Sequence, residues 1–211
     1  MAMARGDYGE GIRRIAGGRF VPGVLEVRHD TPDALIALGL PDLPMHHTAA
    51  HAAAEMAPEG VNGHGVDPAV LLSLPELLEH PVAAVESGRR DGVIAVVLDA
   101  VAGDLDDPLT AMIDPGTTLG CGSRELMETN FILSVHGRRH IMREVSDALA
   151  KGEALLYDGP RFWSLIARCK RTWEECDSLR SELDADRKAP PAGQDGHRWA
   201  KMGSIGRRPS H

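Results

Sequence analysis

The side chains of this 211-residue chain that best suit chemistry cluster around His136. Histidine titrates near pH 7, so His136 can serve as a general acid or a general base. Arg138 can stabilise the negative charge that develops in a transition state. Ser134 lies two residues before His136, and residues two apart share a strand face. This pattern predicts a polar rim suited to acid–base chemistry on a phosphodiester, for example in RNA, where a base activates the 2′-hydroxyl and an acid protonates the leaving oxygen.

Three further side chains are candidates for the same rim. His64 lies between two glycines just before an expected helix, so it can approach the strand ends. Ser87 ends an expected strand, and Tyr157 places a phenol in the last one. Each candidate also has a structural alternative: the histidines cap or line turns, the serines satisfy neighbouring strands, and Tyr157 packs half-buried.

A histidine cluster raises the alternative of a small metal hydrolase. His47 and His51 are four residues apart, and His46 is adjacent. No glutamate follows His47 in the metalloprotease pattern, and no third ligand has a suggestive spacing. The three cysteines match no zinc pattern either. We therefore expect neither a metal nor a cofactor.

The expected elements combine helices with a sheet of short strands. Apolar alternation and turn residues predict strands at 24–28, 82–87, 93–99, 109–114, 128–136 and 154–157. Capping residues and 3.6-residue periodicity predict helices at 33–38, 48–56, 67–74, 138–151 and 161–183, with a short one near 8–15. Residues 115–123 read as a Gly/Thr/Cys loop.

These elements predict an α+β fold: a single, mainly antiparallel sheet packed on one face against N-terminal helices, with a C-terminal helix and a disordered tail. The strand at 93–99 is apolar on both faces, so we place it centrally. We divide the chain into an N-terminal arm (1–23), an α+β domain that includes the C-terminal helix (24–183), and a disordered basic tail (184–211).

Composition and charge limit the partners. Aromatic residues are only 4% of the chain, so the core must be aliphatic. The net charge is −8; residues 187–211 hold six basic residues and one acidic, a net of +5, which leaves −13 for residues 1–186. An acidic body is a poor generic binder of phosphate backbones, although a local basic pocket is compatible with it. No segment has the pattern of a membrane span or a signal peptide, so we expect the cytoplasm of the producing cell, with delivery to a target cell or carriage in a virion as alternatives.

Four pieces of the sequence, in this order, resemble a known family. They are Thr31-Pro32-Asp33-Ala34-Leu35 running to Leu43-Pro44; His64-Gly65 followed by Leu74-Pro75 and Pro81-Val82; Ser134-Val135-His136-Gly137; and Leu155-Leu156-Tyr157. Together they resemble the phage-associated nuclease-like domains at the C-terminus of MuF-type minor capsid proteins. Those domains are grouped with the barnase–EndoU–colicin–RelE metal-independent ribonucleases.

The resemblance implies a phage- or toxin-type ribonuclease domain, with an RNA substrate and an immunity protein or a phage structural protein as partners. In it, His136 and His64 are the acid and base, Arg138 clamps the anion, and Ser134 and Tyr157 position the substrate. Relatives tend to carry tyrosine where this chain has His136. This departure and the acidic body favour the alternative, a catalytically silent interaction or structural module of the same fold.

Overall fold

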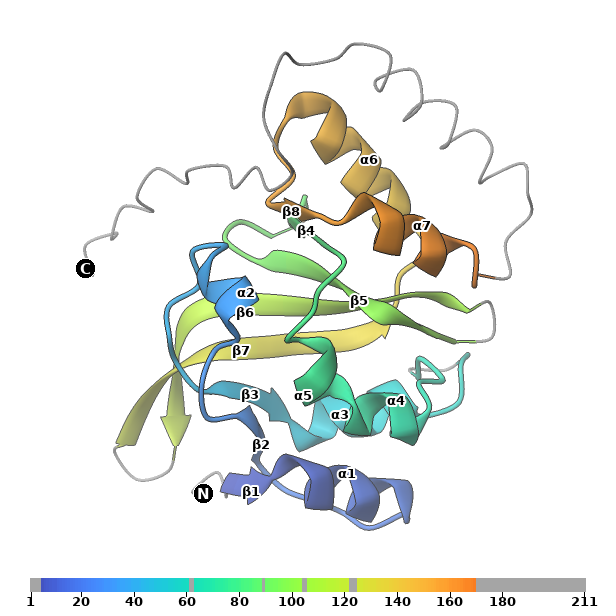
Figure 1. The fold of residues 1–211 in the computed structure, drawn as a ribbon. Coiled ribbons are helices and arrows are strands. Elements are labelled where there is room, and N and C mark those ends of the chain that lie inside the picture. Colours follow the sequence, from blue (N-terminus) through green and yellow to red (C-terminus); the bar gives the residue numbers. More distant parts are fainter. Residues whose placement is uncertain (1–4, 61–62, 89, 104–105, 122–124, 170–211) are drawn as a thin grey trace.

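The computed structural model describes residues 5–60, 63–88, 90–103, 106–121 and 125–169. The strands in that part of the chain are β1 (Arg5–Asp7), β2 (Val24–Arg28), β3 (Met45–Thr48), β4 (Ala83–Glu86), β5 (Ile94–Ala102), β6 (Asp107–Cys121), β7 (Glu125–Gly137) and β8 (Leu156–Tyr157). They form one sheet in the order β1-β2-β3-β7-β6-β5-β4-β8 (Figure 1). Five pairings are antiparallel, whereas β1–β2 and β3–β7 are parallel. The predicted single sheet in a mixed helix-and-strand fold is therefore present, but its mainly antiparallel arrangement is only partly matched, because a parallel step lies in its middle.

Helices cover both faces of this sheet (Figure 1). They are α1 (Tyr8–Ala16), α2 (Asp33–Ile36), α3 (Ala49–Met56), α4 (Pro68–Leu72), α5 (Leu74–Leu77), α6 (Ile141–Lys151) and α7 (Gly159–Ile166). The larger apolar cluster joins the sheet to α1, α3, α4 and α5, and a second cluster joins its opposite face to α6 and α7. Helices from the first eighty residues do cover one face, as predicted, but α6 and α7 also cover the opposite face, which the prediction did not include.

Strand β5 lies deep in the sheet, as its continuous apolar sequence predicts. Val96 and Leu98 belong to the cluster under the N-terminal helices, whereas Ala95 and Val97 belong to the cluster under α6 and α7. Successive strand residues point to opposite faces, so a strand covered on both sides must be apolar at every position. This two-sided burial fixes the register of the strands that pair with β5.

Local capping explains where several helices begin and end. The Thr48 side chain accepts a hydrogen bond from the backbone N–H of His51 at the start of α3, and Asp67 accepts one from Ala69 at the start of α4. Gly152 ends α6 in the left-handed region, at φ +71°. These starts and this stop confirm the predicted boundaries.

The structure corrects the predicted loop at 115–123. Strand β6 continues through this stretch to Cys121, and pairs from Thr117↔Thr129 to Cys121↔Glu125 extend the β6–β7 hairpin into an arm beyond the rest of the sheet (Figure 1). A register shift between Asp114 and Thr117 accommodates Pro115 and Gly116, the residues that suggested a loop. A ladder with a bulge at its base can therefore include turn-forming residues.

The predicted N-terminal arm is integrated into the domain. Strand β1 pairs with β2, and Tyr8 and Ile12 of α1 are buried in the main core. Helix α7 is described to Ile166 and the chain to Cys169; the remainder of the helix predicted at 161–183, and the disordered tail predicted at 184–211, lie outside the described residues. Among the described helices, none is long and apolar enough to span a membrane.

Candidate functional site

A pocket of about 230 Å³ lies on the sheet face that carries α6 and α7. It is lined by Ser87, Arg90, Val93, Met112, Leu133, Ser134, His136 and Arg138. The structure therefore brings together both predicted serines, the predicted histidine of β7 and the predicted arginine. These side chains come from the end of β4, the following turn, β6, β7 and the segment that leads into α6.

An irregularity in β7 aims these residues into the pocket. Met112 pairs with Ser134, but the next residue of β6, Ile113, pairs with Ile132, so Leu133 is an extra residue in β7. Such a bulge re-aims side chains on its strand. It lets Ile132 and Val135 both point into the main core while Leu133 and Ser134 face the pocket.

His64 reaches this site from the loop after α3. Its ring stacks on the ring of His136, with centroids 4.2 Å apart and planes 14° from parallel. Two glycines shape the loop: a Cβ on Gly63 would lie 2.2 Å from the backbone oxygen of Ala57, and Gly65 has φ +59°. The predicted approach of His64 to the strand end is therefore what the structure shows, although the catalytic roles of the two histidines stay predictions.

His136 is neutral at pH 7. Burial, and then the nearby His64 and Arg138, lower the pKa of His136 from its ordinary value to about 4. Within the described part of the chain, its Nδ1 is buried and has no hydrogen-bond partner. A neutral imidazole can accept a proton or a hydrogen bond, but it adds no positive charge to the pocket.

The two pocket arginines face carboxylates. Arg138 Nη2 lies 2.8 Å from Glu144 Oε1, and its Nη1 donates to the Met112 sulfur at 3.0 Å. Arg90 Nη2 lies 3.5 Å from Asp114 Oδ2. Each of these two arginines is therefore paired with an anion, and neutral His136 adds no charge beside them.

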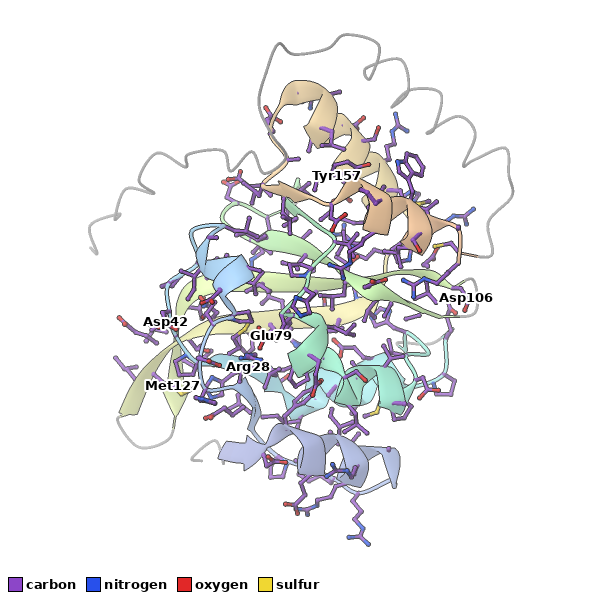
Figure 2. All side chains as sticks on the ribbon, in the orientation of Figure 1. Arg28, Asp42, Glu79, Asp106, Met127 and Tyr157 are labelled. Atoms are coloured by element: carbon purple, nitrogen blue, oxygen red, sulfur yellow. The ribbon has the colours of Figure 1, made fainter. Side chains whose placement is uncertain are left out.

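Tyr157 lies away from the pocket, on the edge strand β8 (Figure 2). Four strand-to-strand steps separate β8 from β7 in the sheet, which corresponds to about 19 Å at the usual strand spacing. The Tyr157 ring packs against Phe162 of α7, with centroids 5.3 Å apart. Tyr157 is thus a partly buried packing residue under α7, the structural alternative given for it above.

Of the histidines considered for a metal site, His46 is separated from the other two, whereas the ring centroids of His47 and His51 lie 6.2 Å apart. His46 Nδ1 lies 3.0 Å from Thr129 Oγ1, whereas His47 faces Glu55, with 3.3 Å between Nε2 and Oε1. Neighbouring strand residues point to opposite faces, so His46 and His47 cannot bind the same metal ion. The described residues contain no group of three or more metal-ligating side chains.

Family comparison identifies residues 56–162, about half of the chain, as a Phage MuF-C-terminal domain. The chain belongs to this family. The match spans the loop of His64, all the pocket-lining residues, helix α6 and the first half of α7, so the pocket lies within the MuF C-terminal domain. No curated protein and no solved structure matches the chain. The family supports the predicted phage origin and carries no statement about nuclease activity.

Sequence reasoning missed Arg90 and Met112, which line the pocket. It also missed Glu55, which contacts β7 behind the pocket without lining it. Its carboxylate is almost completely buried and accepts a hydrogen bond from the backbone N–H of Val135, between Ser134 and His136. Glu55 lies in an alanine-rich helix, where a glutamate ordinarily marks the solvent-exposed side. Only the tertiary contact between α3 and β7 reveals its position.

Proposed function

We propose that this MuF C-terminal domain is a phage-derived interaction module, and that the surface around the His136 pocket contacts its partner without catalysis. The observation that carries the proposal is the ion pair between Arg138 and Glu144. A phosphorane-like transition state needs cations that are free to meet its extra charge. Here Arg138, the more buried pocket arginine, is bound to a carboxylate, and Arg90 also faces one.

The contact between the histidine rings also favours a module. In phosphoryl transfer the attacking and leaving oxygens are roughly in line, so a base and an acid act from opposite sides of the phosphate. Rings whose centroids are 4.2 Å apart are in van der Waals contact and leave no room for a phosphate between them. The acidic body adds a further barrier to RNA.

Co-sedimentation with phage particles tests this proposal. Purified domain is mixed with particles of a phage that encodes it and separated on a density gradient. We expect the wild-type domain to travel with the particles and Arg90→Glu, at the rim of the pocket, to reduce the bound fraction at least about tenfold, as charge reversal in an interface does. Arg13→Glu, on an exposed position of α1, is the matched control and should bind like wild type. Absence of wild-type binding would count against the module.

A second candidate is a metal-independent ribonuclease of toxin type, with an immunity protein as its partner. The convergence of His64, His136, Ser134 and Arg138 on one site favours it, because these residues were selected as catalytic from sequence. Catalysis would require the loop of His64 to move so that a phosphate enters between the rings. This candidate predicts RNA cleavage that a chelator does not inhibit and that His136→Ala abolishes.

A further inference from the structure

Strand β7 loses its outer partner where it enters the pocket. Strand β3 pairs with β7 only from Met45↔Asn130 to His47↔Ile132 and then passes into α3. The next stretch of β7 carries Ser134 and His136. Backbone groups at such an edge need other partners when they are buried.

Glu55 of α3 replaces the missing strand. Its Oε1 accepts the backbone N–H of Val135 at 2.5 Å, and only 1% of the residue is exposed. The hydrogen bond lies one residue from both Ser134 and His136 and directly after the bulge at Leu133. A bulge disrupts the ladder locally, so a hydrogen bond from outside the sheet beside it restrains the backbone there.

The carboxylate lies in a buried polar cluster. His47 Nε2 lies 3.3 Å from Glu55 Oε1, and Tyr8 of α1 is also buried nearby. Burial and the negative charge of Glu55 raise the pKa of Tyr8. Among the described residues, the Tyr8 hydroxyl, both ring nitrogens of His47 and Glu55 Oε2 have no hydrogen-bond partner. Burying polar groups without partners costs free energy, so their presence here calls for a structural or functional reason.

We propose that Glu55 is the positioning residue of the pocket: its carboxylate holds the β7 backbone at Val135 and thereby fixes the side chains of Ser134 and His136. The proposal rests on the proposed function only in treating this pocket as the contact surface. It also assigns a role to α3, which packs against both α1 and β7 and carries Glu55 between Tyr8 and Val135. Glu55 itself does not line the pocket.

NMR spectroscopy of the full chain tests this role through His136. The groups that face its ring are His64 and Arg138. In Glu55→Ala, β7 relaxes and the ring becomes more exposed, so we expect the pKa of His136 to rise from about 4 to above about 5, and the His64–His136 ring contact to disappear from NOE spectra. Glu55→Gln keeps an acceptor oxygen, so this variant should retain the wild-type pKa of His136 and the ring contact with His64. The ring signals of exposed His80 are the internal control and should keep their positions.

Three outcomes would overturn the proposal. The first is an unchanged His136 pKa and ring contact in a folded Glu55→Ala variant, even if its melting temperature falls, because that result describes a purely structural glutamate. The second is a Glu55→Gln variant as perturbed as Glu55→Ala. The third applies if Glu55→Ala does not fold. In that case rapid hydrogen exchange of the Val135 amide in Glu55→Gln would overturn the proposal, because the acceptor for this amide is still present. None of these NMR readouts needs a binding partner. If the domain fails to bind phage particles but gives the expected NMR result, only the proposed interaction function is refuted.

Discussion

The lowered pKa of His136 makes the stability of the domain depend on pH. In the unfolded chain His136 takes up a proton below about pH 6.5, whereas in the folded protein it does so only near pH 4. Between these values the unfolded state binds more protons, so the free energy of unfolding falls as the pH falls. The contribution is complete above pH 6.5 and is lost through the window down to pH 4. His136→Gln removes the titration and keeps a polar side chain.

The size of the effect follows from the two pKa values. A full shift from 6.5 to about 4 is worth about 3.4 kcal/mol. At pH 5 only part of that difference applies, about 2 kcal/mol. The ring is only partly buried, so solvent screening lowers our expectation to about 1 kcal/mol. Wild type should therefore lose about 1 kcal/mol more than His136→Gln between pH 7 and pH 5.

Urea unfolding at the two pH values measures this difference directly. Each protein is compared with itself, so the carboxylates that titrate in both proteins cancel, as does any change in basal stability caused by the substitution. The ring titration of His136, followed by NMR, gives the midpoint independently. Equal losses in both proteins, or a ring midpoint near pH 6.5, would refute the reasoning that His136 is buried and neutral.

The remaining predictions concern close packing, the polar core and the tail. A Cβ on Gly137 would lie 2.5 Å from the backbone oxygen of Ala102, so Gly137→Ala should lower the unfolding free energy by about 1–3 kcal/mol; Gly88→Ala, with nothing within 4 Å, should change it little in the same urea titration. Asn130 is buried with three hydrogen bonds, and Asn130→Ala should cost about 3 kcal/mol, with a normal denaturant midpoint contradicting that estimate. Removal of residues 187–211 should leave the melting temperature within about a degree; the low apolar content of that segment is the reason, and calorimetry is the check.

Periodicity predicted most of the elements because each has a clear local signal. The apolar run of β5 predicts a strand covered on both faces, and Thr48 and Asp67 mark the helices that follow them. Pairing between distant segments has no such signal. The parallel step from β3 to β7 and the extension of β6 to Cys121 depend on tertiary contacts that propensity does not contain.

The candidate site was partly predictable for the same reason. The spacing of Ser134 and His136 along one strand places both on one face, and the glycines beside His64 permit its approach. Tyr157 was chosen for its position at a strand end, but a sequence does not state how many strands intervene. The ion pair of Arg138 with Glu144 depends on how α6 turns after β7. Arg138 was predicted to bind an anionic substrate, but in the structure its charge is paired with Glu144.

RNA cleavage in the presence of a chelator is the measurement that tests the module most directly. Purified full-length protein is incubated with EDTA and a panel of single-stranded RNAs, and the ends of any products are mapped; His136→Ala and Arg138→Ala, shown to be folded by circular dichroism, are run in parallel. A non-catalytic module predicts that wild type leaves the RNAs as intact as the two variants do. Chelator-resistant cleavage with cyclic-phosphate ends that falls on the order of a hundredfold in His136→Ala would contradict it and establish the ribonuclease instead.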